Sequence, residues 1–237
     1  MNTYNGIMVL IDLLFPKFCL GCRLPGTYLC PHCQKNLRQL KQGRCFYCQR
    51  DSLYGLTHPL CLKKFNVDGV TSLYSYNGFL KKIIKNFKYR LATKIAQDLF
   101  RAITPEAIDR LSFYKKLSPP IYFQPIPLSR KKFRERGFNQ AFILTKFFMT
   151  YLNLPIADFL LRVKDTDPQS VQKNKRDRSI NLRNAFVINQ KTNFGLINNA
   201  RIILVDDVIT SGSTIREAAK VLRKAGALKI YALSLAG

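Results

Sequence analysis

The sequence has 237 residues, of which 47% are hydrophobic, so it is long enough to bury a core and is not that of a disordered chain. Lysine and arginine number 39 against 14 aspartates and glutamates, which gives a net charge of +25. Such a charge attracts polyanions, so a nucleic acid or a phosphate-rich ligand is one interpretation, and a solvated basic surface is the other.

The first apolar run, Ile7 to Phe15, is too short to cross a membrane and contains Asp12. No lysine or arginine precedes it, as one would in a secretory signal. We therefore expect a short core-packing helix that ends at Pro16, no membrane span, and a cytoplasmic, reducing location.

The seven cysteines favour metal binding over disulfides, because disulfide frameworks usually belong to short secreted chains. Six of them form three C-x-x-C pairs, and two residues in such a pair can both point at one ion. Two pairs supply four thiolates for a tetrahedral zinc ion, namely Cys19, Cys22, Cys30 and Cys33. A second set starts with Cys45 and Cys48 and has only Cys61 besides. The sequence predicts one or two structural zinc ions and leaves open which pairs share an ion.

The organisation along the chain indicates two domains, a cysteine-rich part at residues 1–66 and an α/β part at residues 67–237. In the second part strand-like and helix-like segments alternate, which predicts a parallel sheet with helices on both faces. Strands are expected at 70–76, 121–127, 159–163, 185–189, 201–207 and 230–236. Helices are expected from Gly78 through Ile95, at 138–152 and at 213–224. The polar stretch 164–182 is long for a structureless loop, which indicates a functional or a mobile segment.

The most informative segment is RIILVDDVITSGSTIREAA, beginning at Arg201. Four apolar residues form a strand that ends in Asp206 and Asp207, whose carboxylates can accept hydrogen bonds from vicinal ribose hydroxyls. A helix N-terminus then offers free N–H groups and hydroxyls to an anion. The residues of this predicted 5′-phosphate loop are Thr210, Ser211, Gly212, Ser213 and Thr214. The segment resembles the phosphoribosyl pyrophosphate (PRPP) motif of type I phosphoribosyltransferases.

A second candidate site is the basic stretch SRKKFRERGFNQA, which follows the strand at 121–127. Guanidinium groups bind phosphate oxygens in pairs, so this stretch is expected to hold a pyrophosphate or another polyanion. The candidate residues are Ser129, Arg130, Arg134 and Arg136. The alternative is the solvated start of a basic helix, and Lys131 and Lys132 are the weakest candidates.

The whole chain resembles the competence protein F (ComF) family, through LLFPKFCLGC, FKYR and P-x-P-L followed by RGFNQA. That family combines a zinc-binding amino-terminal domain with a phosphoribosyltransferase-like domain and is associated with DNA uptake. The resemblance places His58 where the family has a cysteine, which implies a second zinc site of Cys45, Cys48, His58 and Cys61, or else a degenerate one. It also implies that Gln169 and Arg178 belong to a loop that closes over PRPP.

Three functions follow from these features. The first is a protein that binds PRPP and handles single-stranded DNA during uptake, with DNA-uptake proteins as partners. The second is a phosphoribosyltransferase that moves ribose 5-phosphate from PRPP, with Mg²⁺, to a nitrogen nucleophile and releases pyrophosphate. The third is a regulator that senses PRPP. Fold alone does not decide among them.

Overall fold

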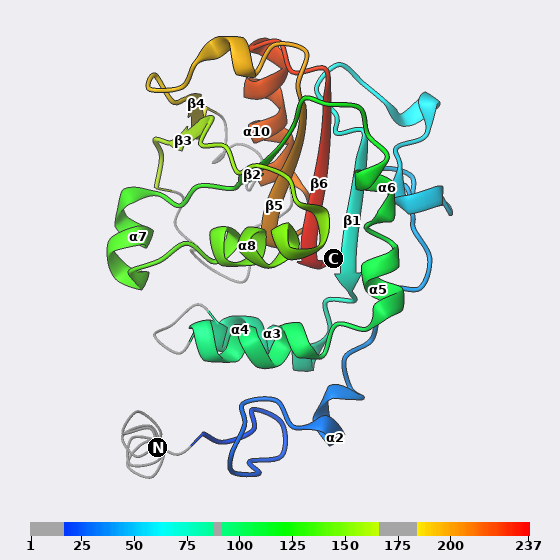
Figure 1. Ribbon diagram of the computed structural model, residues 1–237, viewed down its shortest axis with the longest axis vertical. Coiled ribbons are helices and arrows are strands. Elements are labelled where there is room, and N and C mark those ends of the chain that lie inside the picture. The colour runs from blue at the N-terminus through cyan, green and yellow to red at the C-terminus, as the bar shows by residue number, and fades with distance from the viewer. Residues whose placement is uncertain (1–16, 88–91, 166–183) are drawn as a thin grey trace.

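The computed structural model describes residues 17–87, 92–165 and 184–237, and its centre is a four-stranded parallel sheet (Figure 1). In spatial order the strands are β1 (Gly69–Tyr74), β6 (Lys229–Ala236), β5 (Arg201–Val208) and β2 (Ile121–Pro125). All of β1 and nearly all of β6 are buried, as expected of parallel strands that are covered on both faces. The four strands lie where the sequence predicts them.

Helices cover both faces of this sheet, which confirms the predicted fold class. On one face, Leu144 and Phe148 of α8 (Gln140–Leu152) share a buried cluster with Ile203 of β5. On the other face, Ile215 of α10 (Ser213–Lys224) shares a second cluster with Ile202. Neighbouring strand residues point to opposite faces, so a single strand such as β5 supplies side chains to both clusters.

The segment from Gly78 to Ile95 corrects one prediction, because it forms two helices rather than one. Helix α3 (Gly78–Phe87) ends before α4 (Ala92–Arg101) begins, and the two lie side by side. Leu80 and Ile95 are both buried in the cluster on the α8 face, so the apolar spacing reflects two helices that bury one face each. Periodicity alone does not reveal such a break when both halves bury the same kind of face.

The strands predicted at 159–163 and 185–189 exist, but they lie outside the parallel sheet. β3 (Leu160–Arg162) and β4 (Phe186–Ile188) pair with each other in an antiparallel ribbon. Leu160 and Phe186 are buried, whereas Leu161 and Val187 are exposed. Antiparallel strands can expose one face to solvent, whereas parallel strands are buried on both faces. These two strands therefore pair with each other and do not join the buried sheet.

The basic stretch after β2 contains the helix α7 (Arg130–Arg136), whereas a basic helix start was predicted only as the alternative to an anion site. The Ser129 hydroxyl oxygen accepts a hydrogen bond from the Lys132 N–H at 3.4 Å and caps its start. Gly137 ends it in the left-handed conformation, with φ of 78°. The remaining short elements are α2 (Pro31–Gln34), η1 (Leu53–Gly55), η2 (Pro59–Cys61), α5 (Pro105–Asp109), α6 (Ser112–Lys115) and η3 (Phe194–Leu196).

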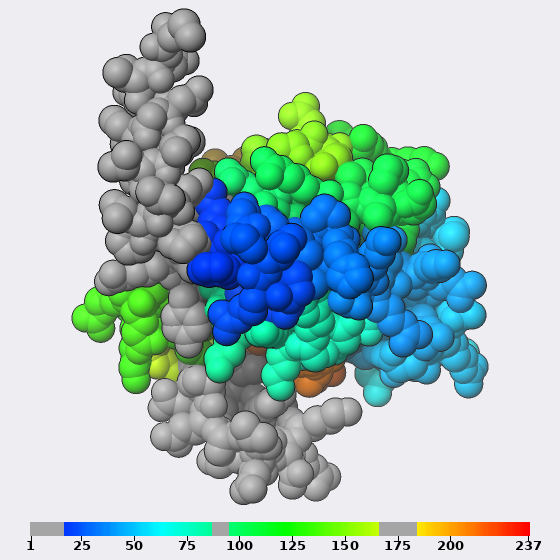
Figure 2. All heavy atoms as spheres, turned by 90° about the horizontal axis from the view of Figure 1, so that it is seen from below, coloured from blue at the N-terminus to red at the C-terminus, as the bar shows by residue number. Residues whose placement is uncertain are grey.

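Figure 2, which views the molecule from below, shows the described residues of the cysteine-rich part as a band across that face, and Figure 1 shows the later ones beside β1. From residue 17 to residue 66 the described elements are α2, η1, η2 and isolated bridges, so regular structure is sparse, as in small zinc-binding modules. The helix predicted at Ile7 to Phe15 lies outside the described residues. The domain boundary at residues 66 and 67 stays a prediction.

Asp68 joins the cysteine-rich part to the start of the sheet. Its buried carboxylate accepts a hydrogen bond from the Ile230 N–H at 2.8 Å. It also pairs with the guanidinium of Arg223 and lies 3.0 Å from the ammonium of Lys229. Removing one partner from a buried ion pair leaves uncompensated charge, so this junction is expected to carry a large share of the stability.

We expect Asp68→Asn to lower the free energy of unfolding by about 3 kcal/mol, because Arg223 then loses its charged partner in a buried place. Denaturant unfolding of the full chain measures this change. The control Asp109→Asn alters an exposed carboxylate and should change the free energy of unfolding by less than about 0.5 kcal/mol. Equal effects of the two substitutions would show that the junction has no special role.

Candidate functional site

The predicted phosphate loop lies at the carboxyl edge of the sheet, where β2 and β5 are neighbours. Their register pairs Pro125 with Val205, so the residues after both strands emerge side by side. The chain after β2 leads to α8 on one face, whereas the chain after β5 leads to α10 on the other. A crevice opens where neighbouring strands send their helices to opposite faces, and α/β sheets bind ligands there.

The loop from Ile209 to Gly212 is shaped to present backbone donors. Gly212 precedes α10 with φ of 64° and ψ of 12°, a left-handed conformation that favours glycine. Among the described residues, no side chain caps this helix start. The hydroxyls of Ser211 and Ser213 lie 3.0 Å apart and are half-buried, while Thr210 is exposed. Free N–H groups and hydroxyls at a helix N-terminus are the donors that an anion needs.

The two carboxylates stand at the end of β5, one residue apart. The Asp207 N–H donates to the Asp206 side chain at 2.8 Å, and the Asp207 side chain is buried. Because adjacent strand residues point to opposite faces, the two acids can approach a ligand from different sides. Their role as ribose-binding residues stays a prediction.

Two residues were missed by the sequence reasoning: Arg162, which interacts with Asp206, and Gln140, which contacts Arg136. Burial lowers the pKa of Arg162 on β3, while the charge of Asp206 opposes that shift and the charge of Arg136 adds to it. Arg162 therefore lies within electrostatic reach of both. Arg136 also donates to the Gln140 side-chain oxygen at 3.0 Å. The motif RGFNQA contained a signal for Gln140, but nothing local pointed to Arg162.

The other predicted anion ligands of the basic stretch differ in exposure. Arg130 and Arg134 are exposed on α7, and Ser129 is buried as the helix cap. These residues stay predicted anion ligands. Gln169 and Arg178, predicted to close over the ligand, lie outside the described residues.

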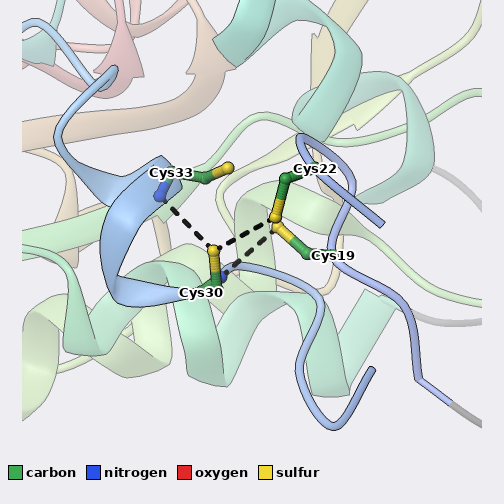
Figure 3. Close-up of side chains that lie close together, drawn as sticks. All are labelled: Cys19, Cys22, Cys30 and Cys33. Carbon is green, nitrogen blue, oxygen red and sulfur yellow. Dashed lines mark hydrogen bonds between the residues drawn. The ribbon is translucent and has the colours of Figure 1, made fainter. Parts of the chain in front are cut away.

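Metal group 1 consists of Cys19, Cys22, Cys30 and Cys33, whose sulfur atoms all lie within 4.8 Å of one another (Figure 3). The Sγ atoms of Cys22 and Cys30 are 3.5 Å apart. That spacing is close to the edge of about 3.8 Å expected for a tetrahedron with Zn–S bonds of about 2.3 Å. The Cys30 N–H points at the Cys19 sulfur at 3.5 Å, as in a zinc knuckle.

Metal group 2 consists of Cys45, Cys48, His58 and Cys61, whose ligand atoms also lie within 4.8 Å of one another. His58 Nδ1 is 3.2 Å from the Cys48 sulfur, and His58 Nε2 is 3.1 Å from the backbone oxygen of Asp51. A proton on Nε2 would donate to that carbonyl and leave the Nδ1 lone pair facing the sulfurs. A backbone partner on the far nitrogen is the usual support of a histidine ligand. His58 is thus placed as a fourth ligand.

In each metal group, hydrogen bonds lower the pKa of one thiol. Burial would raise the pKa of Cys19, but backbone N–H groups, chiefly that of Cys30, lower it to about 6. The same balance, with Cys48 as the chief donor, lowers the pKa of Cys45 to about 7. Burial and the neighbouring thiols raise the pKa of Cys61 to about 11. Four ligands of this kind fit zinc, which displaces the remaining thiol protons when it binds.

A cleft of 1190 Å³ separates the cysteine-rich part from the carboxyl edge of the sheet, and we call it the basic cleft. Thr210 of the phosphate loop and Phe46 of metal group 2 both line it. Within the described part of the chain its lining has no carboxylate and five cations, namely Lys35, Arg38, Lys41, Arg44 and Arg110. The guanidinium of Arg110 also donates to the backbone oxygens of Leu40 and Ser72, which ties the two parts together.

Across 17–87, 92–165 and 184–237, none of the helices combines the length and the apolar character that a membrane crossing requires.

We expect the full chain to hold about two zinc ions, and His58→Ala to lower this by about one. Cys22→Ala should also lower the content by about one ion, because it removes a ligand from metal group 1. The control is His32→Ala, an exposed histidine inside a C-x-x-C pair that should leave the zinc content unchanged. Elemental analysis of the purified variants measures these contents. An unchanged zinc content in His58→Ala would show that metal group 2 is degenerate.

The sequence pattern of the phosphoribosyl transferase domain family matches residues 139–236. This span contains α8, β5, the phosphate loop, α10 and β6, which are the elements that form the crevice. The match supports the fold assignment for the sheet domain.

Three curated proteins resemble the chain over most of its length. Competence protein F of Haemophilus influenzae is 32% identical over 226 residues, covering 92% of this chain and 96% of that protein. Competence protein ComFC of Bacillus subtilis is 28% identical over 211 residues, covering 85% and 80%. DNA utilization protein YhgH of Salmonella typhimurium is 27% identical over 226 residues, covering 92% and 96%. Coverage of this extent includes both the metal groups and the sheet, and the chain therefore belongs to the competence protein F (ComF) family.

Proposed function

We propose that this chain binds a ribose 5-phosphate ligand such as PRPP at the β5–α10 loop and holds single-stranded DNA in the basic cleft. The observation that carries the first half is the start of α10, which no side chain caps and which follows the two adjacent carboxylates by one short loop. The observation that carries the second half is a cleft with five lining cations that reaches Thr210 of the same loop.

The chemistry of the loop fits the separate parts of the ligand. The 5′-phosphate would accept from N–H groups between Gly212 and Ile215, where the helix dipole favours negative charge. The ribose hydroxyls would donate to Asp206 and Asp207. Mg²⁺ is expected to accompany PRPP, because phosphate and hydroxyl oxygens are the hard ligands it prefers. Arg162 lies within electrostatic reach of both Asp206 and Arg136, so these two cations would compensate the pyrophosphate charge.

The basic cleft suits a flexible polyanion better than a small anion. Four of the five lining cations lie between Lys35 and Arg44, and the fifth is Arg110. Phe46 and the tyrosines Tyr74 and Tyr76 also contribute to the lining, although Tyr74 itself is buried. Single strands bind where basic grooves follow the phosphates and aromatic rings accept bases by stacking. The names of the relatives, which refer to competence and DNA utilization, agree with a nucleic-acid role.

A second candidate function is transfer of ribose 5-phosphate from PRPP to a nitrogen nucleophile. It is favoured by Arg162, which interacts electrostatically with both Asp206 and Arg136, because cations there would stabilise the departing pyrophosphate. In that reaction the bond between the anomeric carbon and the pyrophosphate oxygen breaks, and a bond from the nitrogen to that carbon forms. Consumption of PRPP with an added base distinguishes transfer from binding alone.

We expect the double substitution Asp206→Asn with Asp207→Asn to abolish PRPP binding in calorimetry with Mg²⁺. The change makes the site more positive, so simple attraction of the anion would instead strengthen binding; a loss would point to the ribose and Mg²⁺ contacts. The charge-matched control is Glu106→Gln with Asp109→Asn, two exposed acids. Tight binding retained by the first variant, with an intact fold, would overturn the site assignment.

We expect Arg38→Ala with Lys41→Ala to weaken binding of a labelled oligo-dT and to flatten its salt dependence. Each lost phosphate contact should reduce the slope of log K against log salt by about 0.7, so two contacts give about 1.4. Fluorescence anisotropy at several salt concentrations measures the slope. Lys115→Ala with Lys116→Ala removes the same charge from exposed positions outside the cleft lining. The same slope in both double variants would place the DNA elsewhere.

A further inference from the structure

The knuckle of metal group 2 touches the phosphate loop directly. Only two residues, Phe46 and Tyr47, stand between the ligands Cys45 and Cys48. The ring of Phe46 lies against Gly212: a Cβ atom at that glycine would lie 2.5 Å from the ring carbons Cε1 and Cζ. The residue that opens α10 is therefore in contact with a side chain held next to two metal ligands.

Tyr47 fixes the same knuckle from the other side. Its hydroxyl oxygen accepts a hydrogen bond from the Val67 N–H at 3.0 Å, just before β1. Its ring meets that of Phe46 edge to face, with centroids 5.5 Å apart and planes at 84°. Both rings pack on the cluster beneath α10. The Phe46 ring is thus held by its partner ring, by the sheet and by the knuckle backbone.

The knuckle backbone itself depends on the metal ligands. Between residues 43 and 61 the regular structure consists of η1, η2 and the isolated bridges of Arg44 to Asp51 and Leu56 to Gly69. Such a segment has little core of its own, and small modules of this kind fold when metal binds. Loss of the ion from metal group 2 would release the loop that carries Phe46.

Metal group 1 provides an internal comparison, because it contacts a different surface. The Thr27 hydroxyl and the Tyr28 N–H each donate to Asp98 of α4 at 2.8 Å. A Cβ atom at Gly21 would lie 3.1 Å from the Phe79 ring of α3. These contacts attach metal group 1 to the α3–α4 pair rather than to the loop before α10.

We propose that metal group 2 positions the phosphate loop through Phe46, so that metal occupancy and anion binding at the start of α10 are linked. Phe46 is then a positioning residue: its ring holds the backbone of Gly212 in the left-handed conformation that turns the helix N–H groups toward the ligand. Linkage is reciprocal, so a ligand on the loop must also tighten metal group 2 around its ion. The identity of the ligand rests on the proposed function, whereas the contact between Phe46 and Gly212 does not.

The first test needs no organic ligand and uses the full zinc-loaded chain. Hydrogen exchange at the amides of residues 210–216 should become faster in Phe46→Ala and in His58→Ala. Cys22→Ala, which removes a ligand from metal group 1, should leave exchange in this segment as in the unchanged chain. Equal protection in all three variants would overturn the proposal. Should His58→Ala fail to fold, Phe46→Ala and Phe46→Leu carry the test, with partial recovery expected in the leucine variant.

The second test uses ribose 5-phosphate in calorimetry and zinc release to a chromogenic chelator. Phe46→Ala should weaken ribose 5-phosphate binding by about tenfold, and Phe18→Ala, an exposed phenylalanine beside Cys19, should not. Ribose 5-phosphate should slow zinc release from Cys22→Ala, where metal group 2 holds the remaining ion. Unchanged affinity and unchanged release would overturn the linkage. No binding to the unchanged chain would refute the proposed ligand and leave the exchange result to decide the positioning role.

Discussion

The structure depends on one constraint, the burial of parallel strands on both faces. β5 and β6 have no exposed face, so helices must cover them from two sides, and the connections after β2 and β5 diverge. At the carboxyl edge between β2 and β5, the connections to α8 and α10 leave for opposite faces of the sheet. Polar groups such as Asp206 and the N–H groups before α10 can stand there without a burial cost. The candidate site is thus a product of sheet topology.

The cysteine-rich part differs from the sheet domain, because it has too few apolar side chains to form a core of its own. Its two groups of four ligands take the place of that core, and each group is attached to a different part of the sheet domain. One contacts the α3–α4 pair through Asp98, and the other contacts the start of α10 through Phe46. The two metal groups are therefore alike in chemistry and different in their structural consequences.

Local patterns allowed much of this to be predicted. The strand, the two acids and the helix from Ser213 to Lys224 follow from a continuous segment, and metal group 1 follows from cysteine spacing. His58 required a family resemblance, because one histidine in a loop has no local signature. The contact between Phe46 and Gly212 and the position of Arg162 near Asp206 join residues far apart in sequence, and no periodicity encodes them. The break after α3 was missed because the apolar spacing is uniform across it, and the bounds of α7 were not predicted because dense charge hides helix ends.

The strand order has a consequence for how the chain folds. β1 lies at the edge of the sheet and pairs with β6. The hydrogen bond from Ile230 to Asp68, at the start of this pairing, joins residues 162 positions apart. During synthesis β1 can therefore pair only after β6 has been made, because β6 lies between β1 and β5 in the sheet. Both metal groups precede β1 and close short loops, so they can take up metal while the sheet is incomplete. Metal binding can therefore precede sheet closure, and it can position Phe46 before the loop that it contacts has been made.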